Sequence, residues 1–205
     1  MKNMIRNTLL VGLAVARFAM SQEQTLLQDV HHGGFGSYTL QGTRIDGHSR
    51  LFTGMKGAWI INHSLYLGIG GYGMIKGIDA PADTAGNAQY LQMGYGGALI
   101  GYTILSDKLV HFNVESLIGA GGYVLSDGKW DEHENDCDEE CKHDMIQPFF
   151  AWEPRVGVEV NVTKFMRVSA GVGYRLIVQD EAKNGFSDSD LGGPVGSIDF
   201  KFGRF

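Results

Sequence analysis

The sequence has no apolar run long enough to cross a membrane as a helix. Spanning about 30 Å of hydrocarbon takes roughly 20 apolar residues, and the run Thr8–Ala16 is far shorter. A mature chain that lies in a membrane must therefore do so as a closed β-barrel, because only helices and closed barrels satisfy every backbone hydrogen bond there.

Cysteine, proline and positive charge are also scarce. Two cysteines exclude a disulfide-rich scaffold, and four prolines argue against a disordered Pro/Gly linker. The formal net charge of −6 argues against nucleic acid as a partner, because phosphates require a basic surface. Glycine is abundant instead, with 30 residues. Glycines within strands mark bends and positions without a side chain, and a narrow barrel needs both.

Residues 1–21 have the pattern of a secretory signal peptide. Lys2 and Arg6 precede the short apolar run, and Ala19 and Ser21 are the small residues that a signal peptidase reads, which places cleavage before Gln22. An N-terminal anchor helix is the alternative, and the short run argues against it. No cysteine follows the run, which excludes a lipoprotein anchor. We expect a periplasmic lead-in over 22–32 and one barrel over 33–205.

From residue 33 onward, apolar and polar residues alternate with a period of two, which predicts strands. The eight expected strands are 33–43, 50–61, 65–77, 90–105, 109–125, 147–161, 165–178 and 194–204. Tight turns are expected at 62–64, 106–108 and 162–164. The other connections are the shorter 44–49 and the long, polar 78–89, 126–146 and 179–193. Short turns at one end and long loops at the other are typical of up-and-down outer-membrane barrels, with the short turns in the periplasm.

Each strand has one apolar and one polar face. A soluble barrel would turn the apolar face inward, whereas a membrane barrel turns it toward lipid. The signal peptide, the strand lengths and the loop asymmetry favour the membrane barrel, with outer-membrane lipid around it. Nine charged residues then point into a narrow lumen, where unpaired charges are costly, so we expect a paired network. They are Lys56, Glu115, Glu153, Arg155, Glu159, Arg167, Arg175, Asp199 and Lys201.

Two residues carry more specific expectations. Pro154 lies within an expected strand that has no free edge, which predicts a β-bulge there. Phe205 ends the chain with the terminal aromatic residue expected of outer-membrane barrels. We expect the outer-membrane assembly machinery to recognise the C-terminal strand.

The segment from Asp127 to Asp144 concentrates negative charge, with nine acids and two lysines. Cys137 and Cys141 in an exported chain most often form a disulfide. Together with His133 and His143 they could instead bind zinc, and the acids could attract calcium. Free thiols and a solvated acidic loop without any site are the remaining readings.

Catalytic motifs are weak. The pattern Gly68-x-Gly70-x-x-Gly73 matches a dinucleotide fingerprint, but it lies within an expected strand with no helix after it. His111 and Glu115 share a face that Ser116 does not. We therefore expect no catalysis and no cofactor.

Several segments resemble a family of small outer-membrane β-barrel proteins from Gram-negative bacteria of the Bacteroidetes type. The resemblance covers most of 33–205 and leaves out the acidic segment. It implies the fold and the location, and it brings no activity or catalytic residue with it. The segments are WIINHSLYLGIGGYG (59–73), LQMGYGGALIGY (91–102), KLVHFNVESLIGAGG (108–122), EPRVGVEVNVTKFMRV (153–168) and the C-terminal residues 187–205.

The sequence thus favours an outer-membrane barrel with a structural role, or with a surface-interaction role through its extracellular loops, whose partner it does not name. A narrow channel or conduit for small molecules is the alternative. A lipid-modifying enzyme would need a nucleophile, a base and oxyanion donors at one rim, and no such set is visible. A soluble barrel with an apolar ligand would need the opposite assignment of faces.

Overall fold

The computed structural model describes residues 31–80, 89–126, 146–180 and 186–205. The expected signal peptide and the whole acidic segment, including His133, Cys137, Cys141 and His143, lie outside the described residues. None of the described helices is long and apolar enough to cross a membrane.

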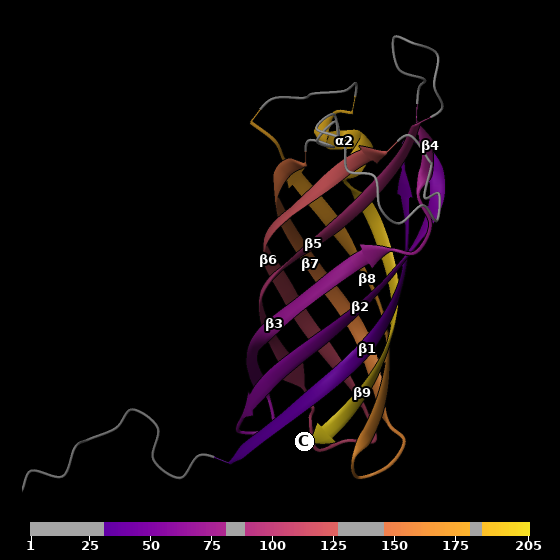
Figure 1. The fold of residues 1–205 in the computed structure, drawn as a ribbon. Coiled ribbons are helices and arrows are strands. Elements are labelled where there is room, and N and C mark those ends of the chain that lie inside the picture. Colours follow the sequence, from indigo (N-terminus) through magenta and orange to yellow (C-terminus); the bar gives the residue numbers. More distant parts are fainter. Residues whose placement is uncertain (1–30, 81–88, 127–145, 181–185) are drawn as a thin grey trace, which may run out of the picture. The chain divides into compact units, whose positions relative to one another are not determined.

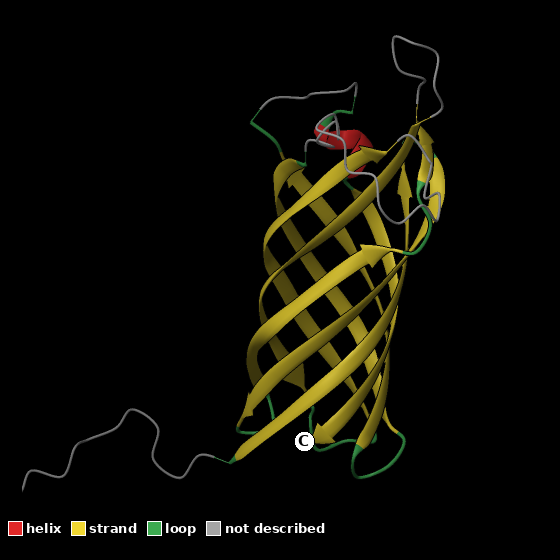
Figure 2. Cartoon of the chain, viewed as in Figure 1, coloured by secondary structure: helices red, strands yellow, loops and turns green. Residues whose placement is uncertain are grey.

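The described residues are almost entirely β-sheet (Figure 2). The one helix among these described residues, α2 (Asp188–Leu191), is short and precedes the last strand. The strands are β1 (His32–Ile45), β2 (His48–Ile61), β3 (Leu65–Met74), β4 (Ile78–Ala80), β5 (Gln89–Ile104), β6 (Val110–Ser126), β7 (Gln147–Asn161), β8 (Met166–Val178) and β9 (Gly193–Arg204).

Eight long strands close into an antiparallel barrel (Figure 1). Consecutive strands pair along the chain, β3 pairs with β5, and β9 returns to pair with β1. The short β4 pairs with β5 beyond the end of β3, so it extends the same edge of the sheet after an interruption. The prediction of a closed eight-stranded barrel is confirmed, and its strand bounds differ from the expected ones by a few residues.

The turn between β1 and β2 differs from the expectation. A six-residue loop was expected over 44–49, but the structure has a hairpin with Asp46 and Gly47 at its tip. Their φ angles are 47° and 73°. Positive φ at both central residues is typical of a type I′ turn, for which Asp-Gly is among the strongest sequence signals.

Gly47 therefore has a measurable role. Gly47→Ala should lower the free energy of unfolding by about 1–2 kcal/mol, because a side chain is strained in the left-handed region. Gly36→Ala is the matched control, since a Cβ at Gly36 would meet nothing within 4 Å. Urea unfolding in lipid vesicles, followed by tryptophan fluorescence, measures both. Equal losses in the two variants would contradict this role of the turn.

Pro154 does not produce the expected bulge. The ladder between β7 and β8 has no pairs at 153 and 154, but it resumes in the same register, from Trp152 opposite Leu176 to Arg155 opposite Gly173. The ladder with β6 continues through Ser116 opposite Pro154. The missing N–H therefore interrupts one ladder locally without adding a residue to the strand.

Large apolar side chains cover the outer wall of the barrel. Met55 and Ile69 are each 72% exposed, and Val172 is 63% exposed. Polar and charged side chains of the opposite parity are buried inside, together with an apolar cluster that includes Phe52, Leu99 and Leu117. This arrangement reverses that of a soluble barrel and matches that of a barrel surrounded by lipid.

Candidate functional site

The charged interior of the barrel is its most distinctive site. All nine charged residues expected in the lumen are buried there. They come from β2, β6, β7, β8 and β9, and closure of the barrel brings them together from distant parts of the sequence.

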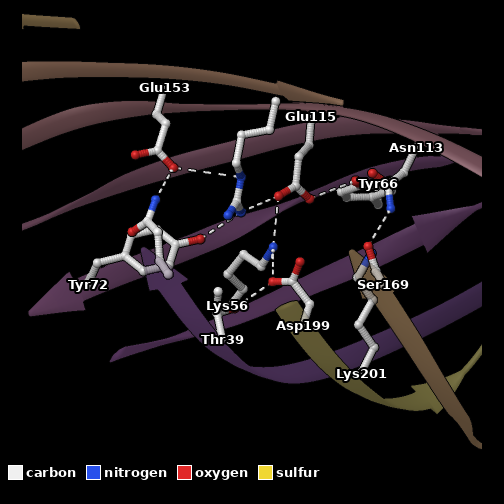
Figure 3. Close-up of polar contacts among 12 residues, drawn as sticks. Thr39, Lys56, Tyr66, Tyr72, Asn113, Glu115, Glu153, Ser169, Asp199 and Lys201 are labelled. Carbon is white, nitrogen blue, oxygen red and sulfur yellow. Dashed lines mark hydrogen bonds and ion pairs between the residues drawn. The ribbon is translucent and has the colours of Figure 1, made fainter. Parts of the chain in front are cut away.

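Lys56 joins two carboxylates within the polar network of the interior (Figure 3). Its Nζ contacts Glu115 Oε1 at 2.7 Å and Asp199 Oδ1 at 2.8 Å. Asp199 also accepts a hydrogen bond of 2.6 Å from the Thr39 hydroxyl. One lysine thus joins carboxylates from two strands, β6 and β9, that are not neighbours of its own strand β2 in the barrel.

Glu115 is shared by two cations. Arg155 donates to the same carboxylate oxygen as Lys56, and it also donates to the Tyr72 hydroxyl at 2.7 Å. The other oxygen of Glu115 accepts a hydrogen bond of 2.9 Å from the Tyr66 hydroxyl. Both oxygens are therefore partnered, as a buried carboxylate requires.

A second cluster lies toward the end of the barrel that holds the short turns. Glu159 contacts Lys201 at 2.5 Å, His111 at 2.8 Å and Arg167 at 3.1 Å. Phe205 lies at this end, with the Arg167 guanidinium 3.9 Å from the centre of its ring. The terminal phenylalanine thus packs against luminal residues.

Polar groups continue toward the opposite end. Glu153 accepts hydrogen bonds from the Tyr95 hydroxyl at 2.5 Å and from the Gln41 amide at 2.8 Å. Arg175 is fully buried, and it donates two hydrogen bonds, of 2.8 and 3.1 Å, to the backbone carbonyl of Leu191. Arg175 thus anchors the end of α2 to the barrel interior.

An apolar cluster accompanies this anchor. Leu191 is fully buried, and Phe186, which precedes α2, is 4% exposed. They belong to the same buried cluster as Ile45, Phe52 and Leu91. The connection between β8 and β9 therefore packs onto the barrel interior at this end.

Helix α2 is stabilised at its start by a capping box. The Asp190 carboxylate accepts hydrogen bonds from the Ser187 hydroxyl at 2.6 Å and from the Ser187 backbone N–H at 2.8 Å. These bonds favour the charged form and lower the pKa of Asp190 below its usual range. The Asp46 N–H donates to the Asp190 carbonyl at 3.0 Å, which joins α2 to the β1–β2 turn.

A small cavity lies among the side chains of the barrel interior. A cavity of about 10 Å³, bordered by Tyr66, Glu159, Arg167 and Lys201, lies near the short-turn end. Such a volume holds about one water molecule. The buried side chains of the described strands occupy the space around this cavity, as expected for eight strands.

Sequence reasoning did not single out the uncharged partners of the network. Tyr66, Tyr72 and Tyr95 donate to or accept from the charged groups, and Thr39 and Gln41 do the same. Each lies on the same face of its strand as other buried residues. The alternation along the strand could therefore have predicted that these side chains point into the lumen. Within the described ranges, no group of three or more His, Cys, Asp or Glu side chains is placed to hold a metal ion.

Comparison with known proteins identifies the fold. No family model and no curated protein matches the chain. Among solved structures, Neisserial surface protein A (NspA) is 13% identical over 87% of this chain and 100% of its own, with a TM-score of 0.59. The chain has the fold of a small outer-membrane β-barrel.

Two further structures have lower TM-scores. Ail of Yersinia pestis is 10% identical over 84% of this chain and 97% of its own, with a TM-score of 0.49. OprG of Pseudomonas aeruginosa is 11% identical over 85% and 94%, with a TM-score of 0.41.

The outer wall agrees with this fold. An apolar outer wall around a polar interior is typical of the β-barrel proteins of outer membranes. The chain accordingly has the fold and the apolar outer wall of an outer-membrane β-barrel that faces lipid.

Proposed function

We propose that this chain is a non-conducting, non-catalytic outer-membrane barrel that acts as a structural element or a surface-interaction protein through its extracellular end. The observation that carries the proposal is the cross-lumen contact of Lys56 with both Glu115 and Asp199. A side chain held at both carboxylates obstructs the path that an ion would take, and Arg155 fills the space beside it.

The end that holds α2 is the proposed functional surface. Its connections follow β4, β6 and β8, and they are much longer than the turns at the other end. Because function in small barrels resides in loops or lumen, a filled lumen leaves the loops. The acidic segment between β6 and β7 is the most distinctive of them in sequence, and its charge favours a cationic surface partner.

We also propose a family for this barrel and a route by which it is assembled. The resemblance over 33–205 favours a Bacteroidetes-type family, and the C-terminal strand ending at Phe205 is the proposed contact with the assembly machinery. We further propose that the chain consists of a signal peptide over 1–21, a lead-in and a barrel. A disulfide between Cys137 and Cys141 is also proposed.

Planar-bilayer recording tests the closed lumen. The purified, folded barrel should give no discrete conductance steps, because ion pairs occupy its cross-section. A barrel of the same preparation should migrate differently on a gel with and without boiling, which shows that it is folded. Reproducible steps from such a preparation would favour the alternative function, a narrow channel for small molecules.

Surface interaction needs a separate test. Cells that display the chain would be compared with cells in which residues 127–145 are replaced by a short Gly-Ser linker, on an array of basic peptides and host matrix proteins. Binding that depends on the acidic segment supports a surface-interaction role. Equal binding by both strains would argue against the acidic segment as the contact.

A further inference from the structure

Two histidines meet at the end of the barrel that holds the short turns. His31 lies immediately before β1, and His63 lies in the turn between β2 and β3. Their ring centroids are 5.3 Å apart, with an angle of 35° between the ring planes. Both residues come from segments far apart in sequence, so the fold itself creates this pair.

The backbone holds the pair in place. The Asn62 N–H donates to the His31 carbonyl at 2.9 Å, and the His31 N–H donates to the Asn62 side-chain oxygen at 3.2 Å. The segment that contains His31 is therefore tied to the turn by two hydrogen bonds. Sequence reasoning had assigned His31 to a periplasmic lead-in.

His63 also occupies a position that usually belongs to glycine. Asn62 and His63 have φ angles of 52° and 59°. The Ser64 N–H donates to the Ile61 carbonyl at 3.2 Å, so Asn62 and His63 are the central residues of a β-turn within the three-residue connection 62–64. Glycine accepts a left-handed backbone most easily at the second central position. This turn thus has a histidine where glycine would fit most easily, and the ring of that histidine lies next to His31.

We propose that His31 and His63 form a two-histidine site for a divalent transition-metal ion such as Cu²⁺ or Zn²⁺, with water as the remaining ligands. Imidazole nitrogens bind Zn²⁺ at about 2.0–2.1 Å, which separates the centroids of two such rings by roughly 5 Å around a tetrahedral ion. The observed separation agrees with this geometry. The χ2 torsion of histidine is broad, so each ring can rotate to bind an ion between them.

The test uses a chain without the other candidate ligands. His133→Asn, Cys137→Ser, Cys141→Ser and His143→Asn are combined in the full-length, untagged chain, which is exported, purified and kept in detergent micelles. Calorimetric titration with Cu²⁺ should give one site per barrel. Electron paramagnetic resonance of the bound Cu²⁺ should show hyperfine coupling to two imidazole nitrogens.

His63→Gly is the decisive variant, because glycine keeps the turn conformation while removing a ligand. It should weaken Cu²⁺ binding at least tenfold, and its gel mobility should still change on boiling. His48→Asn is the matched control, an exposed histidine in the hairpin at the other end, and it should bind as the parent does. Absence of binding by the parent would overturn the proposal, as would unchanged affinity in His63→Gly.

Discussion

Replacing Lys56 by methionine should lower the free energy of unfolding by about 3–5 kcal/mol, the cost of breaking a buried ion pair by removing one partner. The substitution leaves Asp199 with the Thr39 hydroxyl and Glu115 with Arg155 and Tyr66. Asp199 then remains buried without the ammonium group that neutralised it. Urea unfolding of the barrel in lipid vesicles measures the loss.

The matched control is an ion pair of similar length on the surface. Lys108 and Asp107 are 2.9 Å apart, with side chains 62% and 70% exposed. Lys108→Met should change the free energy of unfolding far less than Lys56→Met, because water screens the pair and the remaining carboxylate stays hydrated. Similar losses in Lys56→Met and Lys108→Met would show that the luminal network does not act as a buried charge cluster.

A double substitution separates charge from packing. Adding Asp199→Asn to Lys56→Met removes the stranded negative charge, so it should recover part of the lost stability. If the loss came from the missing lysine stem alone, the second substitution would recover nothing. The comparison therefore tests whether electrostatics or side-chain volume dominates at the centre of the lumen.

The alternation of residue types was sufficient to predict the barrel, because every strand must divide its side chains between two environments. It could not assign partners within the lumen. Lys56 and Glu115 are 59 residues apart, and Thr39 and Asp199 are 160 residues apart. Which residues meet depends on the register of eight ladders and on their closure, neither of which is a local property of the sequence.

Two local errors have physical reasons as well. The Asp46-Gly47 hairpin was missed because the polar residues around it suggested a longer loop, although the dipeptide itself is a strong turn signal. The bulge at Pro154 was expected because a missing N–H disrupts a ladder. The neighbouring strand has Gly173 close by, where an added Cβ would lie 2.5 Å from the Pro154 carbonyl. A smooth register is thus compatible with close approach of the two strands.

Replacing Arg175 by methionine should release the connection between β8 and β9 from the barrel. The guanidinium donates both hydrogen bonds to the Leu191 carbonyl, and it lies 5.0 Å from the centre of the Phe52 ring. A hydrogen bond to a charged group contributes about 1.5–3 kcal/mol. We therefore expect a loss of about 3 kcal/mol in the stability of the packed helix α2.

Limited proteolysis measures the release of the connection between β8 and β9. The connection should be cut within residues 179–192 much faster in Arg175→Met than in the parent, because cleavage requires local opening. Arg44→Met is the control, since Arg44 is exposed near the same end of the barrel. Equal cleavage rates in the two variants would contradict the anchoring role of Arg175.

The same variant distinguishes two ways of closing the lumen. If α2 alone closes the barrel, Arg175→Met should conduct ions in a planar bilayer. The contacts of Lys56 with Glu115 and Asp199 do not involve Arg175, so we expect this variant to keep them. We therefore expect faster cleavage without conductance, because the central ion pairs still occupy the cross-section after the helix is released.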